Sequence, residues 1–120
     1  MDKNTHILLL EDEVITAMSL IIDLKKYGYN NSKFVSTSSK AVASAQKQFP
    51  EVLIVDVSLS GRESGIDIAA EISGTSGIPI IITSGYEIED LIPKMGILNN
   101  AHFLRKPINI SKLIQLIERL

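Results

Sequence analysis

Acidic residues follow directly after an apolar segment near the N-terminus. Residues 6–13 read HILLLEDE, so a run of aliphatic residues is followed at once by Glu11 and Asp12. A second apolar run, VLIVDV at 52–57, includes Asp56 near its end. Carboxylates that gather at one place repel one another unless they are protonated or bound to a cation. If the two runs lie side by side, these acids form a candidate cation site.

Two further apolar runs end in polar residues of a different kind. IPIIITS (78–84) ends in Thr83 and Ser84, and AHFLRK (101–106) ends in Lys106. A carboxylate beside a bound metal ion is a competent nucleophile for a phosphoryl group. A hydroxyl and an ammonium opposite it would stabilise the charge on the transferred oxygens. These residue types predict phosphoryl-transfer chemistry.

The available ligand atoms restrict the kind of cation. The chain has no Cys, and neither of its two His residues belongs to the acidic group. Only oxygen donors are supplied, which favours a hard ion that keeps part of its water shell. We therefore expect Mg²⁺, for which Mn²⁺ would be a substitute.

The elements that must position these residues follow from the hydrophobic pattern. The four apolar runs and KFVS (33–36) are typical of short strands, and helical spacing separates them. Gly28 is predicted to end the first helix, and Asn109 to cap the last. Pro93 is predicted to kink or end any helix around it. The expected helices cover residues 13–28, 38–49, 66–73 and 108–120, with a less clear segment at 86–96.

Solid apolar strands alternating with helices predict an α/β fold. The arrangement is a flavodoxin-like (βα)5 sandwich of three layers, with a parallel sheet in the order 2-1-3-4-5. In that order strands 1, 3, 4 and 5 are neighbours about 4.8 Å apart. Their polar ends therefore converge at the edge where such sheets bind ligands. Each residue alone is an ordinary cap or turn residue, but their joint placement favours a functional site.

The bulk properties exclude several classes of protein. The chain has 120 residues, which suits one domain over 1–120, and its net charge is −2. Without a basic stripe, we expect no direct binding to nucleic acid. Residues 1–5 are polar and no apolar run approaches the roughly 20 residues of a membrane span, so we expect a soluble cytoplasmic protein without membrane contact.

The chain resembles the receiver domain of two-component response regulators over essentially its whole length. The matching segments are LLLEDE, VLIVDVSL, IIITSGY and FLRKPI. The resemblance implies that Asp56 is the phosphoacceptor. It also implies that Mg²⁺ is held by Glu11, Asp12, Asp56 and the backbone carbonyl of Ser58.

The resemblance assigns roles to three more residues and to partner proteins. Thr83 would be the switch hydroxyl, Lys106 the phosphoryl partner and Phe103 the switch aromatic residue. The phosphoryl donor would be a sensor histidine kinase or a histidine phosphotransfer protein. An output domain or a second copy would bind the face formed by the fourth helix, fifth strand and fifth helix. The chain departs from the family pattern at Ser60 and Ser64, in a 56–65 loop that looks one residue longer than is commonest.

Two alternatives remain open from the sequence. One is a receiver-like interaction module that no longer switches by phosphorylation. The other is a haloacid-dehalogenase-like phosphatase, which also uses a strand-end Asp, a Lys and Mg²⁺. Such phosphatases usually carry a second acid two residues after the nucleophile, where this chain has Ser58. Receivers catalyse their own phosphorylation and dephosphorylation, so no dedicated enzyme with a separate substrate is expected.

Overall fold

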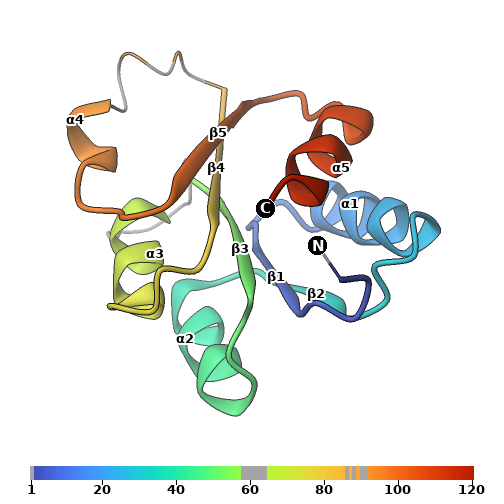
Figure 1. The fold of residues 1–120 in the computed structure, drawn as a ribbon, viewed down its shortest axis with the longest axis horizontal. Coiled ribbons are helices and arrows are strands. Elements are labelled where there is room, and N and C mark those ends of the chain that lie inside the picture. The colour runs from blue at the N-terminus through green and yellow to red at the C-terminus, as the bar shows by residue number, and fades with distance from the viewer. Residues whose placement is uncertain (1, 58–64, 86, 88, 90–91) are drawn as a thin grey trace.

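Five parallel strands form one sheet in the order β2-β1-β3-β4-β5 (Figure 1). The computed structural model describes residues 2–57, 65–85, 87, 89 and 92–120. The strands are β1 (Ile7–Leu10), β2 (Ser32–Val35), β3 (Val52–Asp56), β4 (Ile80–Ser84) and β5 (Ala101–Arg105). The predicted flavodoxin-like fold and strand order are confirmed.

Helices cover both faces of the sheet. They are α1 (Val14–Lys26), α2 (Ser38–Lys47), α3 (Gly65–Ser73), α4 (Ile92–Met95) and α5 (Ile110–Glu118). Helices α1 and α5 pack on one face, and α2 and α3 on the other, as Figure 1 shows. The sheet therefore has a separate apolar core on each side, which is the three-layer arrangement that the sequence predicts.

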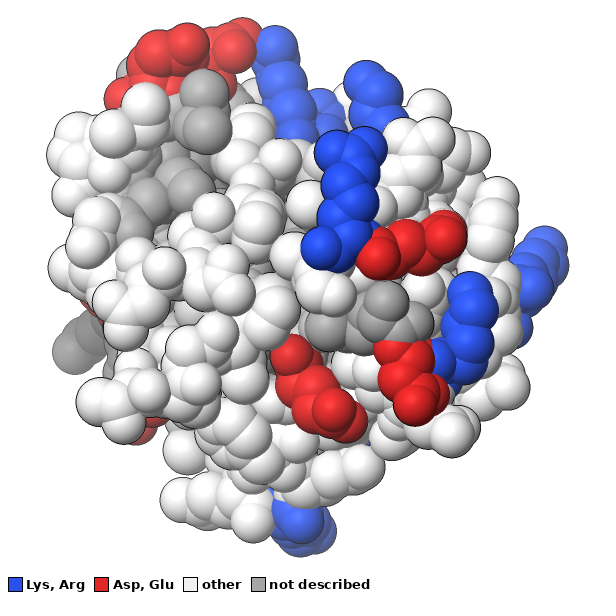
Figure 2. Space-filling view, in the orientation of Figure 1, with Lys and Arg blue, Asp and Glu red and all other residues white. Residues whose placement is uncertain are grey.

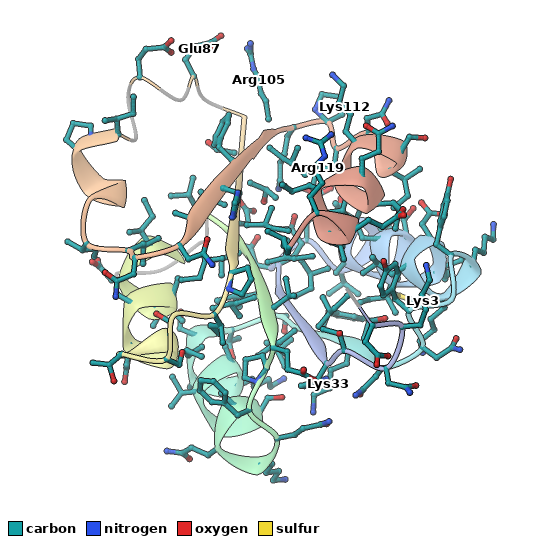
Figure 3. The ribbon with its side chains drawn as sticks, viewed as in Figure 1. Lys3, Lys33, Glu87, Arg105, Lys112 and Arg119 are labelled. Atoms are coloured by element: carbon teal, nitrogen blue, oxygen red, sulfur yellow. The ribbon has the colours of Figure 1, made fainter. Side chains whose placement is uncertain are left out.

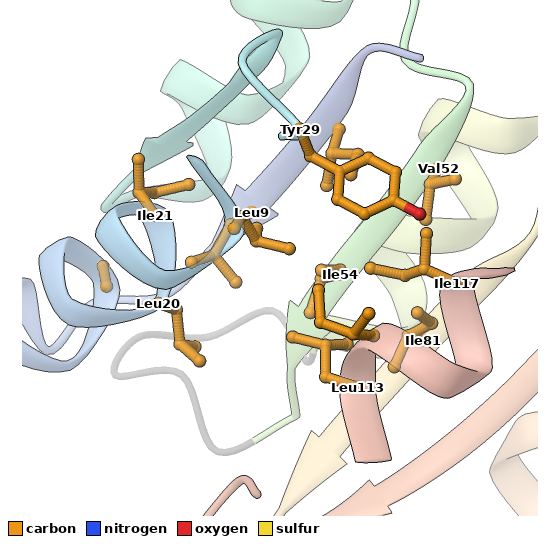
Figure 4. Close-up of a cluster of buried hydrophobic side chains, with 13 residues drawn as sticks. Leu9, Leu20, Ile21, Tyr29, Val52, Ile54, Ile81, Leu113 and Ile117 are labelled. Carbon is orange, nitrogen blue, oxygen red and sulfur yellow. The ribbon is translucent and has the colours of Figure 1, made fainter. Parts of the chain in front are cut away.

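The solid apolar runs form strands that are buried on both faces. Successive side chains of a strand point to opposite faces. In β1, Ile7 and Leu9 enter the core under α1 and α5, whereas Leu8 and Leu10 enter the core under α2 and α3. Figure 4 shows the first of these cores, in which the fully buried ring of Tyr29 lies among aliphatic side chains.

Gly28 and Asn109 lie at the helix ends that the sequence predicts. Gly28 has a φ of +93° just after α1, a conformation that favours glycine, and the Asn109 side chain accepts a hydrogen bond from the backbone N–H of Lys112 at 3.1 Å. Pro93 lies in α4, which is described over four residues only, Ile92–Met95, and ends two residues after the proline. This short helix is consistent with the expected effect of Pro93.

The strand register places the polar strand ends at one edge of the sheet. Leu10 is paired with Val55, and Asp56 with Thr83 on the neighbouring strand. Thr83 is in turn paired with Leu104, two residues before Lys106. The carboxyl ends of β1, β3, β4 and β5 therefore meet, as the site requires.

Charged side chains are mixed over the surface. On the face drawn in Figure 2, Lys and Arg side chains are interspersed with Asp and Glu, and they form no continuous basic patch. Within the described residues, none of the helices has both the length and the apolar character needed to cross a bilayer.

Candidate functional site

Three carboxylates meet at the carboxyl edge of the sheet. Glu11 and Asp12 follow β1, and Asp56 is the last residue of β3. Each supplies one ligand oxygen, and these atoms lie within 4.8 Å of one another. Glu11 is 1% exposed and Asp56 is 3% exposed, while Asp12 is half-buried. The grouping that the sequence predicts is therefore present, with two of its three acids removed from bulk water.

Lys106 lies across this cluster. Its Nζ donates to Glu11 Oε1 at 2.7 Å and to Asp56 Oδ2 at 2.9 Å. Its backbone N–H donates to the carbonyl of Ser84 at 2.7 Å, which continues the β4–β5 pairing one residue beyond the strand. The backbone of the sheet thus holds Lys106 in the position from which its side chain reaches both acids.

Burial and charge change the proton affinities of the cluster. Burial, together with a hydrogen bond to Asp56, raises the pKa of Glu11 from 4.5 to about 7, although the contact with Lys106 acts in the opposite direction. Burial lowers the pKa of Lys106, but its hydrogen bonds to Glu11 and Asp56 outweigh this and the net shift is upward. Burial and the neighbouring Asp56 both disfavour the ionised form of Glu11, and a cation bound at the cluster would offset both effects.

The chemistry of the donor set fits Mg²⁺. The three ligand atoms of the cluster are all carboxylate oxygens, which a hard divalent ion prefers. Glu11, Asp12 and Asp56 would hold the ion, and the ion would reduce the repulsion between their carboxylates. The predicted fourth protein ligand, the carbonyl of Ser58, lies outside the described residues, as do Ser60 and Ser64 of the same loop.

Thr83 and Phe103 lie on the two strands beyond β3. Thr83 is buried, and its hydroxyl donates to the carbonyl of Val55 at 3.4 Å. Phe103 is paired with Ile82 and is partly buried against the core under α2 and α3. Thr83 therefore lies next to Asp56, whereas Phe103 lies one strand further from the acids and faces a helix layer.

An exposed ion pair joins two segments next to the site. Arg105 Nη1 and Glu87 Oε1 are 2.6 Å apart, and more than half of each side chain is exposed. Figure 3 shows the two side chains directed toward one another above the ends of β4 and β5. Exposed pairs of this kind contribute little to stability.

Sequence reasoning missed the role of Gly65. A Cβ at this position would lie 2.4 Å from the carbonyl oxygen of Asp56 and 2.6 Å from Val55 Cγ1. Only glycine lets the first turn of α3 approach the end of β3 this closely. The available signal was a glycine at the start of an amphipathic helix, where intrinsic propensity disfavours it.

A hollow beside Lys106 was also not predicted. It has a volume of about 600 Å³ and lies between α1 and the segment that follows β5. Apolar Ile15, Leu20, Pro107 and Ile108 line it together with polar residues of α1. It could not be predicted because it depends on how α1 lies against residues 106–108.

A doubly wound parallel sheet of this order, with acids and a lysine at its carboxyl edge, defines a class of small α/β signalling domains. The chain matches the response regulator receiver domain over residues 7–118. It therefore belongs to the response regulator receiver family, which confirms the resemblance inferred from its motifs.

Curated relatives and solved structures agree with this assignment. The chain is 32% identical over 113 residues to the transcriptional regulatory protein PdtaR of Mycobacterium tuberculosis, a match that covers 94% of this chain and 55% of PdtaR. It is 30% identical over 86 residues to the phyllosphere-induced regulator PhyR of Methylorubrum extorquens, with 71% of this chain and 32% of PhyR covered. The chain thus spans about half the length of PdtaR and a third of PhyR.

Solved receiver structures have the same fold. The receiver domain of NtrX from Brucella abortus superposes with a TM-score of 0.83 at 25% identity, covering 94% of this chain and 95% of that one. The chemotaxis protein CheY4 of Vibrio cholerae superposes with a TM-score of 0.87 at 20% identity, covering 96% and 97%. The likeness to CheY4 bears on the fold alone.

Proposed function

We propose that residues 1–120 form one cytoplasmic receiver domain that accepts a phosphoryl group on Asp56 in a reaction that needs Mg²⁺. The observation that carries this proposal is the cluster of Glu11, Asp12 and Asp56, within 4.8 Å of one another, with Lys106 bonded to two of them. Burial of charged groups this close together is costly, so their presence at the ligand-binding edge of the sheet favours a chemical role.

In the proposed reaction, a carboxylate oxygen of Asp56 attacks the phosphorus of a phosphohistidine on the donor. The P–N bond breaks, the imidazole leaves and takes up a proton, and an acyl phosphate forms on Asp56. Lys106 and Thr83 stabilise the charge on the phosphoryl oxygens. Mg²⁺ would be held by Glu11, Asp12, Asp56 and the carbonyl of Ser58. When bound, it would neutralise the charge of the carboxylates and of the incoming phosphoryl oxygens.

The donor is a sensor histidine kinase or a histidine phosphotransfer protein. The hollow of about 600 Å³ beside Lys106 supports this choice, because its apolar and polar side chains offer a protein donor a contact surface next to the lysine that bonds to Asp56. Ile15 on its wall is 82% exposed, and Pro107 is exposed on the opposite wall. A donor side chain that contacts these residues would lie near Asp56.

Conversion of Asp56 to its phosphorylated form would draw Thr83 inward and free space for Phe103. The surface expected to respond is the face of α4, β5 and α5, which would bind an output domain or a second copy. Exposed Ile92 and Ile97 on or beside α4 support this surface. Beryllofluoride, whose BeF₃ group stands in for the phosphoryl group, should shift amide NMR signals throughout residues 83–106. Shifts confined to the residues around Asp56 would contradict the switch.

The experiment that tests the function is phosphorylation by acetyl phosphate with and without Mg²⁺. The wild-type chain should take up phosphate only with the metal, and Asp56→Asn should take up none. Asp67→Asn, which changes an exposed acid of α3, is the matched control and should behave as wild type. No uptake by any variant would favour the interaction module. Continuous hydrolysis of an organic phosphate monoester would favour the phosphatase.

A further inference from the structure

The ion pair between Glu87 and Arg105 connects the segment after β4 to the end of β5. Arg105 is the last residue of β5, and the strand register places it opposite Ser84, the last residue of β4. Glu87 lies three residues beyond Ser84, and its Oε1 is 2.6 Å from Arg105 Nη1. The chain that leaves β4 is therefore bonded to the neighbouring strand, as Figure 3 shows.

Both residues of the pair lie close to residues of the proposed switch. Glu87 follows Thr83 by four residues, and Arg105 directly precedes Lys106. Because side chains alternate along a strand, Arg105 lies on the same face of β5 as Phe103. A movement of the end of β4 relative to β5 would therefore change the distance between the two charged groups.

The strand order gives the direction of this change. Thr83 is on β4, which lies between β3 with Asp56 and β5 with Arg105. The Thr83 hydroxyl donates to the carbonyl of Val55 at 3.4 Å, a long hydrogen bond that it would exchange for one to a phosphoryl oxygen. A Thr83 drawn toward a phosphoryl group on Asp56 moves the end of β4 toward β3 and away from β5. The same movement draws Glu87 away from Arg105, so the ion pair opposes it.

We propose that the ion pair between Glu87 and Arg105 is an inhibitory contact that favours the unphosphorylated conformation. This inference rests on the proposed function, since it concerns the switch that follows phosphorylation of Asp56. An exposed pair contributes little to overall stability, but the ratio of two conformations responds to energies of this size. Loss of the pair should shift that ratio toward the active conformation by up to about fivefold.

The first test is a beryllofluoride titration of the whole chain in Mg²⁺, followed by amide NMR. Glu87→Gln keeps the size of the side chain and removes its charge. It should bind beryllofluoride up to about fivefold more tightly than the wild type, because more of the free protein is already in the conformation that binds. Glu89→Gln removes another exposed acid of the same segment and should bind as the wild type does. Equal affinities of Glu87→Gln and the wild type would overturn the proposal.

The second test separates the ion pair from a general effect of negative charge near the site. Removal of any nearby acid reduces the repulsion of an anionic ligand, whether or not Arg105 is present. In a chain that already carries Arg105→Gln, the further change Glu87→Gln should leave the affinity unchanged, because the pair is already lost. If Glu87→Gln tightens binding equally in both backgrounds, the effect belongs to charge alone and the inhibitory contact is refuted.

The dependence on salt gives an independent measurement. More than half of each side chain of the pair is exposed, so added salt should weaken their attraction. The ratio of the affinities of Glu87→Gln and the wild type should therefore fall toward one between about 0.05 M and about 1 M salt. A ratio that differs from one and does not change with salt would contradict an electrostatic contact.

The titrations also distinguish failure of this proposal from failure of the proposed phosphorylation. Amide spectra recorded without ligand establish that each variant is folded. If neither the wild type nor any variant binds beryllofluoride with Mg²⁺, the acceptor role of Asp56 and the inhibitory contact are both refuted. If the wild type, Glu87→Gln and Glu89→Gln all bind with the same affinity, the acceptor role stands and the inhibitory contact alone is refuted.

Discussion

The two ends of the sheet bury polar side chains in different ways. At the amino end, the Nδ1 atom of buried His6 is 3.1 Å from the carbonyl oxygen of Asn31, and Ser32 Oγ donates to the carbonyl of Tyr29 at 2.9 Å. At the carboxyl end, Lys106 bonds to the side chains of Glu11 and Asp56. One end pairs polar groups with the backbone, whereas the other pairs charged side chains with one another.

This difference separates structural polar groups from functional ones. A buried hydroxyl with a backbone partner, such as that of Ser32, costs little, because one hydrogen bond replaces another. The imidazole of His6 is paired with the backbone at Nδ1, whereas its Nε2 has no partner within the described residues. A buried cluster of charged side chains costs several kcal/mol in desolvation, and an apolar substitute would often be more stable. Burial of polar residues alone therefore carries little information on function, but burial of charged side chains together at a ligand-binding edge carries a great deal.

The largest expected effect is the loss of phosphorylation on removal of an acid from the carboxyl end. Asp12→Ala should reduce Mg²⁺-dependent phosphorylation by about a hundredfold or more, the scale at which removal of one charge-stabilising group acts. Ser32→Ala, at the amino end, should destabilise the fold by about 1 kcal/mol and leave phosphorylation unchanged. The rate of phosphorylation by acetyl phosphate, measured for both variants, tests this difference. Normal phosphorylation of Asp12→Ala would remove Asp12 from the site.

The next effect is a dependence of stability on pH that belongs to the carboxyl end. Because the pKa of Glu11 is raised to about 7, the folded protein binds more protons than the unfolded chain between about pH 4.5 and 7. Without metal, protonation of Glu11 should therefore contribute up to about 3 kcal/mol to the free energy of unfolding. This contribution should be fully present below pH 4.5 and be lost as pH rises through 7.

Urea titrations in chelator at pH 5 and pH 8 measure this dependence. The stability of Glu11→Gln should lack this pH dependence, because glutamine does not titrate. Glu51→Gln, at the amino end, should show the same pH dependence as the wild type. Mg²⁺ should also remove it, since the ion favours the ionised carboxylate, and binding should release a proton. Equal pH dependence in wild type and Glu11→Gln would contradict the account of Glu11.

Glycine is required at both ends of the sheet, for different reasons. Gly65→Ala should cost about 2 kcal/mol or more, since its Cβ would overlap the Asp56 carbonyl. Gly28→Ala at the amino end meets no close atom but must keep a φ of +93°, so it should cost about 1 kcal/mol. Gly85→Ala, which has open space and no positive φ, is the control. Chemical denaturation measures the free energy of unfolding of the three variants. A Gly65→Ala variant as stable as the wild type would contradict the close approach of α3 to the end of β3.

The smallest effect is a gain in stability near the amino end. The hydroxyl of buried Tyr29 lies near Val52 and Ile117, as Figure 4 shows, and it has no hydrogen-bond partner in the described part of the structure. Tyr29→Phe should therefore stabilise the fold by about 1 kcal/mol. Tyr27→Phe, which changes an exposed ring, should be neutral. A loss of stability in Tyr29→Phe, measured by urea denaturation, would indicate that the hydroxyl is satisfied.

The sequence predicted the strands, their order and the carboxyl-end cluster because these depend on local patterns. A short apolar run such as 52–57 favours a buried strand where it alternates with helical patterns, and parallel strands bring their ends together. Gly65 and the hollow by Lys106 could not be predicted in this way, since both depend on how a helix lies against another segment. The short α4 could be expected from Pro93, because proline removes a backbone donor and limits helix length.

The identity of the phosphoryl acceptor tests the central claim most directly. The chain is treated with acetyl phosphate and Mg²⁺, and borohydride then reduces any acyl phosphate to an alcohol that survives proteolysis and mass spectrometry. The account predicts a single reduced residue, Asp56, and none when Mg²⁺ is withheld. A reduced residue elsewhere with Asp56 intact would contradict it.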